Sequence, residues 1–377
     1  MKVFEISMIK IDETETIEYF LYGDETAKEP EQEQIEYILT HIKDETSRKI
    51  FRDRLQYSLT KDNFYLADIV KTTAAGEKLY EKLKCEKRKI YLYGAGKRGR
   101  RFAQMFSDIN IVSFVDRDKY GALCGMPVVL LKDFLEQYED GKCLIFITCA
   151  DSHKRVKASL INLGISQADI DSIDDWNAIA AKDIYTQERC ISGKDRITVG
   201  FVDVGAFDGD SVEQFINWSK NPDASVLALE PEVGNYQKCC QNLSKYSNCR
   251  VINAAAGEKT ETGYISQGGI EAALLTLTGD DYEGSSSKTQ IVALDECCKG
   301  FDVKYIKMDV EGFEAQALTG AKMIISKERP CLAISVYHKR EDIWRLPLQV
   351  LSYNPDYKLA FGHYTVGLAD TVMYATL

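Results

Sequence analysis

Polar side chains that could do chemistry stand at the ends of several apolar runs in the second half of the chain. Each run is typical of a buried strand, and the polar residues that end them are Asp203, Glu230, Asn253, Asp309, His338 and His363. In an open parallel sheet the ligand site lies outside the carboxyl ends of the strands. We therefore expect these side chains to gather at one edge. There, carboxylates could bind hydroxyl groups or a cation, and an imidazole could accept a proton.

The first of these runs leads into a glycine corner. Residues 199–210 read V-G-F-V-D-V-G-A-F-D-G-D, and an amphipathic segment follows directly. Glycines at 205 and 209 let the backbone approach a ligand, and the start of the helix supplies free N–H groups. The carboxylate of Asp203 would repel a pyrophosphate, whereas it favours a sulfonium. This combination indicates S-adenosylmethionine as the cofactor.

The C-terminal half of the chain, about residues 195–377, resembles class I methyltransferases that depend on S-adenosylmethionine, and more narrowly the FkbM family. The blocks that carry the resemblance are F-V-D-V-G-A-F-D-G-D-S (201–211), L-A-L-E-P (227–231), N-A-A-A-G (253–257) and Y-I-K-M-D-V-E-G-F-E (305–314). The resemblance implies an α/β fold with a seven-stranded sheet whose last strand is antiparallel. It also implies O-methylation, often of sugars in glycans or of polyketide hydroxyls. The chain departs from the common family pattern at Phe207-Asp208.

The cofactor-binding residues follow from the strand ends and the resemblance together. Asp203, acting through Gly205, is expected to hold the methionine portion, and Glu230 to accept both ribose hydroxyls, because Pro231 ends the strand and turns the carboxylate outward. Asn253 and Ala254 are expected to border the adenine. Phe207 and Gly209 complete the cofactor loop.

The reaction centre is expected around Asp309, with His338 as the favoured general base and His363 as the second candidate. Glu311 would orient His338 or bind sugar hydroxyls, and a structural role for either histidine stays open. A mixed carboxylate–imidazole metal site is the alternative. The spacing of these residues fits no standard ligand motif, so no metal is expected.

Residues 88–175 predict a smaller doubly wound, Rossmann-like unit. A short strand pattern leads into Gly94, Gly96 and Gly99, and Asp116 ends the next strand where dinucleotide folds place a ribose-binding acid. A second nucleotide or nucleotide-sugar site and a purely structural unit are both open. An oxidoreductase acting through this unit, or a non-catalytic scaffold with a methyltransferase fold, are the alternative functions.

Length and composition set the remaining expectations. A chain of 377 residues predicts two or three domains. We assign a helical segment at 1–87, the unit at 88–175, a linker at 176–192 and a methyltransferase domain at 193–377. The helical segment is either a cap or an oligomerisation element, which leaves a homo-oligomer open.

A net charge of −11 argues against nucleic acid as a partner, and no window is apolar enough for a membrane span. The 11 cysteines are interpreted as reduced thiols of a cytoplasmic protein. The expected partner is an acceptor with a hydroxyl group, a small molecule or a glycan, covered by a polar loop at 263–288.

Overall fold

A computed structural model describes residues 9–10, 27–149, 153–181, 184–187, 200–266, 275–276 and 286–377. The chain divides into two compact units. The first comprises residues 1–19, 60–182 and 363–369, and the second comprises residues 20–59, 183–362 and 370–377. The helical segment expected at 1–87 is therefore shared between the two units, whereas the sequence pattern had treated it as one piece.

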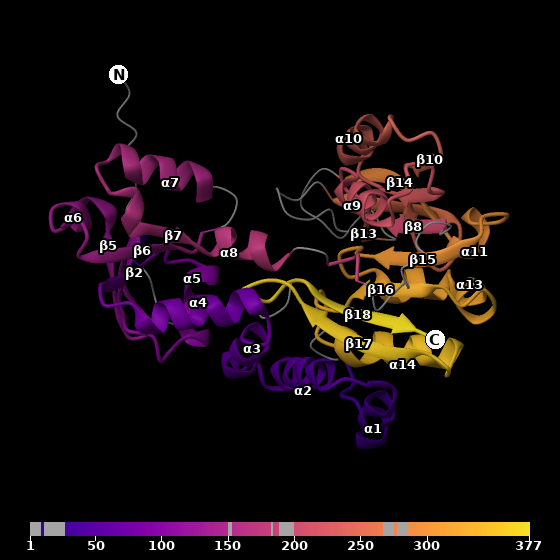
Figure 1. Cartoon of the computed structure of the whole chain (residues 1–377), viewed down its shortest axis with the longest axis horizontal. Coiled ribbons are helices and arrows are strands. Elements are labelled where there is room, and N and C mark those ends of the chain that lie inside the picture. The colour runs from indigo at the N-terminus through magenta and orange to yellow at the C-terminus, as the bar shows by residue number, and fades with distance from the viewer. Residues whose placement is uncertain are drawn as a thin grey trace. The chain divides into compact units, whose positions relative to one another are not determined.

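The first unit is built on a sheet with the strand order β1-β4-β5-β3-β2-β6-β7 (Figure 1). Its elements are β1 (Ile9–Lys10), α3 (Asn63–Val70), α4 (Ala74–Cys85), β2 (Lys89–Tyr93), α5 (Lys97–Met105), β3 (Ile111–Asp116), β4 (Lys119–Leu123), β5 (Met126–Leu130), α6 (Leu131–Leu135), β6 (Cys143–Ile147), α7 (His153–Asn162), a 3₁₀ turn (Gln167–Asp169), β7 (Ile170–Ser172) and α8 (Ile173–Ala180). The strands β5, β3, β2, β6 and β7 are parallel to their neighbours. The predicted doubly wound unit is thus present. The antiparallel β4–β5 pair was not anticipated.

The second unit is built on a sheet with the strand order β10-β9-β8-β15-β16-β18-β17 (Figure 1). Its elements are α1 (Gln32–His41), α2 (Glu45–Thr60), β8 (Gly200–Val204), α9 (Asp210–Ser219), β9 (Val226–Leu229), α10 (Val233–Leu243), β10 (Cys249–Ile252), β11 (Ala255–Ala256), β12 (Glu261–Ser266), β13 (Leu275–Thr276), β14 (Ser286–Val292), α11 (Leu294–Cys297), β15 (Val303–Met308), α12 (Glu314–Thr319), α13 (Lys322–Lys327), β16 (Cys331–Ser335), α14 (Asp342–Tyr353), β17 (Lys358–His363) and β18 (Thr371–Thr376).

Pairing in the larger sheet confirms the predicted seven-stranded architecture. Neighbouring strands are parallel across β10, β9, β8, β15 and β16, and β18 pairs antiparallel with β16. Every residue of β8, β9 and β16 is buried, which explains why these strands read as continuous apolar runs. Their carboxyl ends therefore meet at one edge, where the polar side chains were expected.

The polar segment at 263–288 is not one loop. Its first residues belong to β12 and its last to β14, and these two strands pair antiparallel in a four-stranded sheet with the order β11-β14-β12-β13. The parts of the predicted covering loop at 267–274 and 277–285 lie outside the described residues.

Two short helices, α12 and α13, follow β15 and lie end to end in the sequence. Gly320 stands at the division, where a Cβ would lie 2.0 Å from the carbonyl oxygen of Gly257. The carboxylate of Asp295 accepts hydrogen bonds from two N–H groups at the start of α13. Close backbone packing and this cap therefore end one helix and begin the next.

Helix α2 covers the edge strand β17 of the larger sheet. The Ser47 hydroxyl accepts a hydrogen bond from the Phe361 N–H at 2.8 Å and donates one to the Phe361 carbonyl at 3.2 Å. The rings of Phe51 and Phe361 lie 5.4 Å apart, and Ile42 forms a parallel bridge with Leu359. An unpaired edge strand is prone to intermolecular pairing. Residues before the predicted methyltransferase domain thus complete its sheet.

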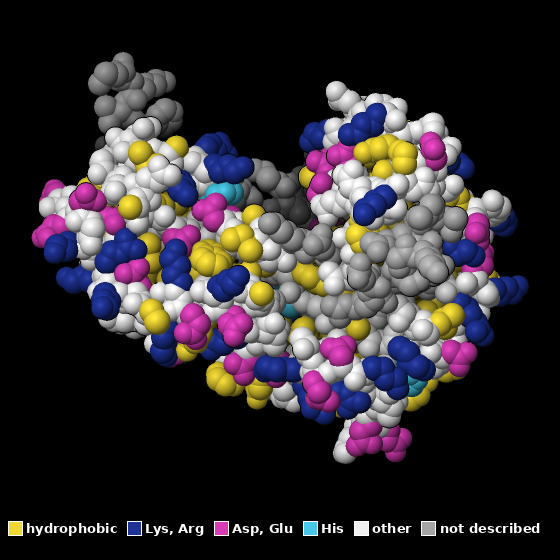
Figure 2. Space-filling view, in the orientation of Figure 1, with side chains coloured by type: hydrophobic (Ala, Val, Ile, Leu, Met, Phe, Trp, Pro, Cys, Tyr) yellow, Lys and Arg dark blue, Asp and Glu magenta, His cyan; other side chains and the backbone are white. Residues whose placement is uncertain are grey.

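The surface of the described residues shows no single dominant charge on the side seen in Figure 2. Lys and Arg side chains are interspersed there with Asp and Glu side chains. Among the helices of the described residues, none has both the length and the apolar character needed to cross a bilayer.

Replacing the hydroxyl of Ser47 tests the contribution of α2. Ser47→Ala leaves the buried polar groups of Phe361 without their side-chain partner, which should lower the free energy of unfolding of the second unit by about 1–3 kcal/mol. Urea denaturation measures this loss, and hydrogen exchange should quicken at the Phe361 amide. Ser352→Ala, which removes an exposed hydroxyl on α14, is the control. Equal effects of the two substitutions would contradict this account.

Candidate active site

The predicted glycine corner lies between the end of β8 and the start of α9. The φ angles of Gly205, Phe207 and Gly209 are 82°, 50° and 92°, in the region that glycine adopts most readily. A Cβ on Gly205 would lie 1.9 Å from the carbonyl oxygen of Asp309, so glycine is required where β8 turns past the end of β15. Phe207 projects from the corner with 56% of its surface exposed.

Asp203 lies beneath the corner in a buried ion pair. Its Oδ1 is 3.0 Å from the Lys307 Nζ, its Oδ2 accepts a hydrogen bond from the Ser211 hydroxyl, and Lys307 also donates to the Gly205 carbonyl. Burial lowers the pKa of Lys307, but the carboxylates of Asp203 and Asp309 more than offset this and the net direction is upward. Asp203 is fully buried, so its charge faces Lys307 rather than a ligand. It acts on the corner through Lys307 and Gly205.

Glu230 follows β9 and faces the same corner. Its Oε2 accepts a hydrogen bond from the Phe207 N–H and its Oε1 from the Glu232 N–H, both at 2.9 Å. Asn253 fixes this turn by donating to the carbonyl oxygens of Glu230 and the next residue at 2.9 and 3.0 Å, and Ala254 is fully buried beside it. Burial raises the pKa of Glu230 to about 7, although the two backbone N–H groups oppose the shift.

Asp309 follows β15, the strand next to β8. The Tyr185 hydroxyl donates to its Oδ2 at 3.1 Å and the Tyr337 hydroxyl to its Oδ1 at 3.4 Å. The His338 Nε2 lies 3.5 Å from the same Oδ1, and 23% of the Asp309 side chain is exposed. Burial alone would raise the pKa of Asp309, but the charges of His338 and Lys307 outweigh it and hold the pKa below its ordinary value.

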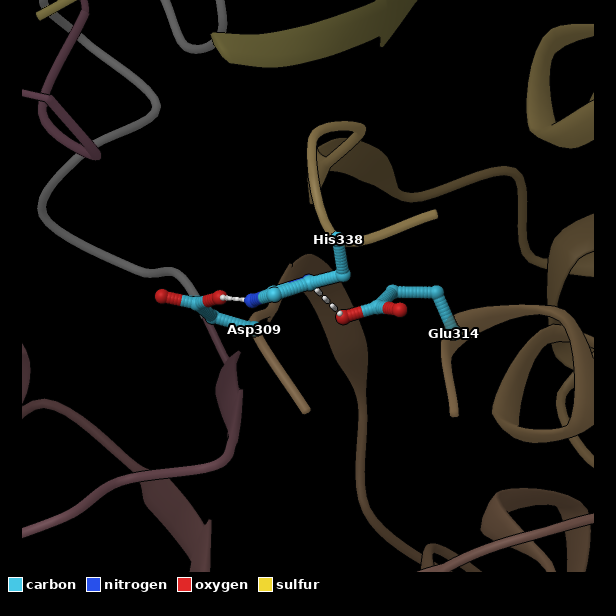
Figure 3. Close-up of side chains that lie close together, drawn as sticks. All are labelled: Asp309, Glu314 and His338. Atoms are coloured by element: carbon cyan, nitrogen blue, oxygen red, sulfur yellow. Dashed lines mark ion pairs between the residues drawn. The ribbon is translucent and has the colours of Figure 1, made fainter. Parts of the chain in front are cut away.

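His338 follows β16 and has carboxylates at both ring nitrogens. Its Nδ1 lies 2.9 Å from the Glu314 Oε1, and its Nε2 lies 3.3 Å from the Glu311 Oε2 and 3.5 Å from the Asp309 Oδ1. Figure 3 shows the ring between Asp309 and Glu314. The Glu314 Oε1 also accepts the Val310 N–H at 2.9 Å, and Glu314 and His338 are both fully buried.

These carboxylates change the interpretation of His338. Burial lowers the pKa of His338, but Glu314, Glu311 and Asp309 together raise it well above its ordinary value. The surrounding carboxylates thus favour the charged form of the ring. The prediction of His338 as the general base assumed an ordinary imidazole, and that role stays a prediction.

Two further carboxyl groups belong to this centre. Asp342 accepts the Lys339 N–H at 2.7 Å, and burial together with Glu314 raises the pKa of Asp342 to about 8. Asp370 lies directly before β18, and burial together with Asp309 raises its pKa to about 7. The centre thus holds more carboxyl groups than cations, and part of that charge is removed by protonation near neutral pH.

Asp309, Glu314 and His338 place potential ligand atoms within 4.8 Å of one another. The two carboxylates nevertheless approach opposite ring nitrogens (Figure 3). An ion bound to both carboxylates would have to displace the imidazole from between them. The arrangement is that of two ion pairs sharing one ring. That the reaction needs no metal stays a prediction.

The glycine corner of the first unit has its own internal partners. Gly94 has a φ of 110°, Gly96 precedes α5, and a Cβ on Gly99 would lie 2.1 Å from the Gly94 carbonyl oxygen. The Asp116 Oδ2 accepts the Ala95 N–H at 2.8 Å. Asp116 therefore lies beside the corner, as its position at a strand end predicted. Nucleotide binding there stays a prediction.

Sequence reasoning missed Lys307, Glu314 and Tyr185, as well as the carboxyl groups of Asp342 and Asp370. Lys307 carried a signal, because it is a lysine within an apolar strand, and Glu314 closes the E-G-F-E block. Tyr185 carried none, since its segment has no pattern. His363 is buried at the end of β17, and its role as a second candidate base stays a prediction.

Solved structures that are similar to this chain share little sequence with it. A methyltransferase FkbM from Methylobacillus flagellatus KT is 21% identical, with a TM-score of 0.45, over 84% of this chain and 100% of its own. Aeropyrum pernix fibrillarin with bound S-adenosyl-L-methionine is 10% identical, with a TM-score of 0.30, over 48% of this chain and 68% of its own. The SAH-bound Podospora anserina methyltransferase PaMTH1 is 11% identical, with a TM-score of 0.30, over 60% of this chain and 95% of its own.

No curated protein matches the sequence. In the comparison with protein families, residues 203–358 match the Methyltransferase FkbM domain. This range begins at the buried aspartate of the glycine corner and contains Glu230, Asp309 and His338. Residues 203–358 of this chain are therefore similar to the Methyltransferase FkbM domain, and the match covers less than half of the chain.

Proposed function

We propose that this protein is an S-adenosylmethionine-dependent O-methyltransferase that methylates a hydroxyl of a sugar or glycan precursor. The observation that carries the proposal is Glu230. Its carboxylate lies at the strand end next to the glycine corner and is bonded to the backbone of that corner. A carboxylate at this place in a methyltransferase domain is suited to accept the two hydroxyls of a ribose.

The residues at the corner fit such a cofactor. Each Glu230 oxygen accepts one backbone N–H in the structure, which leaves lone pairs on both oxygens for hydroxyl donors. Gly205 and Gly209 keep the backbone next to the methionine portion free of side chains, and Asn253 and Ala254 stand at the following strand end, where the adenine is expected. When bound, the cofactor supplies a methyl group on a positively charged sulfur.

The acceptor side is lined by carboxylates. Side-chain exposure is 23% for Asp309 and 32% for Glu311, so both can accept hydrogen bonds from an incoming hydroxyl. Charge-assisted hydrogen bonds of this kind suit an acceptor with several hydroxyls, such as a sugar. Holding the reacting oxygen in line can supply several kcal/mol, about 7–11 in well-oriented systems.

Calorimetry and methyl transfer test this proposal together. The protein should bind S-adenosylhomocysteine and should transfer a labelled methyl group to at least one member of a panel of methyl glycosides and nucleotide-sugars. The first measurement tests the cofactor and the second tests the acceptor class. A folded protein that does not bind S-adenosylhomocysteine would contradict the cofactor, and transfer only to amines would contradict O-methylation.

Binding of S-adenosylhomocysteine should depend on pH through Glu230. The carboxyl has a pKa of about 7 in the free protein, and only its ionised form accepts two hydroxyls. Below pH 7 binding must release a proton, so the affinity should fall by up to about tenfold per pH unit, and above pH 7 it should level off. Calorimetry from pH 5.5 to 8.5 measures this.

Glu230→Gln should weaken binding and flatten the pH profile, because the amide does not titrate. Glu232→Gln is the matched control, since that carboxylate caps α10 through the Asn235 N–H. An unchanged pH profile in Glu230→Gln would show that another group controls binding.

Lys307 should be needed for both the stability of the second unit and the shape of the corner. Lys307→Met leaves Asp203 buried without its cation, which should cost about 3–5 kcal/mol in urea denaturation. The double variant Asp203→Leu/Lys307→Phe removes both charges and should recover most of that stability. It should still bind S-adenosylhomocysteine about 10–100-fold more weakly, because the charged hydrogen bond to the Gly205 carbonyl is lost. Wild-type affinity in a stable double variant would show that the pair does not shape the site.

A further inference from the structure

The feature that carries a further inference is the imidazole of His338, which contacts carboxylates on both sides and has no exposed surface. A group that receives a proton from an acceptor must come within hydrogen-bond reach of it. The ring of His338 is fully buried. The two carboxylates at its Nε2, those of Asp309 and Glu311, are partly exposed, with 23% and 32% of their side chains accessible.

The backbone after β15 is folded to bring these carboxylates to the ring. Strands β15 and β16 pair in parallel, with Met308 opposite Ile334, so Asp309 and His338 follow neighbouring strand ends. Glu311 and Gly312 then have φ angles of 53° and 90°. A non-glycine residue in this region is strained by about 1–3 kcal/mol, and such strain is concentrated at functional sites. The turn carries the Glu311 carboxylate back to 3.3 Å from the His338 Nε2.

Charged and titratable groups approach His338 from every element packed around it. They are Asp309 and Glu311 after β15, Glu314 of α12, Asp342 of α14, Asp370 before β18, Tyr337 beside the ring, and Arg54 of α2, which donates to the Tyr337 carbonyl at 3.3 Å. Lys307 acts on Asp309 by its charge and itself pairs with Asp203. The surroundings of the ring are therefore acidic on balance, which favours its charged form.

We propose that His338 and Glu314 form a buried positioning pair, and that the proton of the acceptor hydroxyl passes to the carboxylates held at Nε2 rather than to the imidazole. The Glu314 carboxylate forms an ion pair with the Nδ1 side of the ring at 2.9 Å and so holds the ring in place. On the Nε2 side, the charge of the ring holds the partly exposed carboxylates of Asp309 and Glu311. His338 is a positioning residue in this arrangement, and it does not touch the acceptor.

The proton balance follows directly and rests on the proposed methyl transfer. The acceptor oxygen forms a bond to the methyl carbon with a lone pair, and the electron pair of the broken carbon–sulfur bond remains on sulfur. The hydroxyl proton moves to a carboxylate oxygen, which becomes a neutral carboxyl group. Of the two carboxylates, that of Glu311 is the more exposed. The imidazolium keeps both its protons throughout.

Nitrogen NMR of the histidine rings tests the proposal without any acceptor. The chain has only four histidines, so ¹⁵N-histidine labelling gives a simple spectrum, and His338→Asn identifies the signal by its loss. Both ring nitrogens of His338 should carry protons from pH 5.5 to 8.5, with and without S-adenosylhomocysteine. A ring that becomes neutral near pH 6.5 would overturn the proposal, because it would then be able to act as a base.

Charge-removing variants test whether the named carboxylates are responsible. Glu314→Gln and Glu311→Gln should each lower the pKa of His338 by about 1–3 units, since each removes an opposite charge within ion-pair distance. Glu328→Gln is the matched control, because that carboxylate lies near Val303 at the opposite end of β15. Glu311→Gln alters a partly exposed side chain, so it tests the proposal even if Glu314→Gln does not fold. Equal pKa values of His338 in Glu311→Gln and Glu328→Gln would overturn it.

Two additions to the same samples separate this proposal from its alternatives. Selective broadening of the His338 signal by Mn²⁺ would overturn the positioning pair in favour of a metal ligand, whereas no selective broadening supports the pair. Calorimetry with S-adenosylhomocysteine reports on the proposed function independently. A charged His338 without cofactor binding contradicts only the methyltransferase proposal, and a neutral His338 with cofactor binding contradicts only the positioning pair.

Discussion

The buried ion pair between Lys307 and Asp203 is the interaction on which the site depends. It links β15 to β8 in the middle of the larger sheet, where the two residues are direct partners. Lys307 also bonds to the Gly205 carbonyl, and Ser211 ties Asp203 to the first turn of α9. One ammonium group thus fixes the relative positions of two strands, the glycine corner and a helix start. Any ligand bound at the corner depends on this arrangement.

The reaction centre continues the same pattern of a buried cation beneath partly exposed carboxylates. At the corner Lys307 lies under the backbone, and after β16 His338 lies under Asp309 and Glu311. The surrounding carboxylates raise the pKa of both groups and so favour their charged forms. A buried charge is tolerated only when it is paired. Each buried cation therefore requires carboxylates next to it, and this requirement limits where those carboxylates can lie. A ligand with hydroxyl groups would thus contact acceptor oxygens whose positions are already restricted.

The sequence predicted the sheet edge well and the chemistry at that edge less well. Apolar runs locate buried strands, so Glu230 and Asp309 could be placed at strand ends from pattern alone. The ion pair between His338 and Glu314 could not be predicted, because the distance of Glu314 from the ring depends on a turn in the left-handed region. Helix α2 was assigned apart from the sheet because its contacts are long-range, as between Arg54 and a carbonyl 283 residues away. Local periodicity carries no information about such pairs.

The first unit shows what the ion pair contributes, because it has the same corner without it. Leu92 precedes Gly94 by two residues, as Asp203 precedes Gly205. Its strand partner is Phe146, just as Lys307 is the partner of Asp203, and Leu92 and Phe146 are both fully buried. An apolar pair therefore suffices to hold a strand–glycine–helix corner in this chain. Replacing buried ion pairs by apolar residues is often neutral or stabilising. The fold thus does not require the charged pair. Its position beneath the proposed cofactor corner is explained by two roles: Lys307 binds the Gly205 carbonyl, and it pairs with Asp203, so that no unpaired carboxylate faces the ligand.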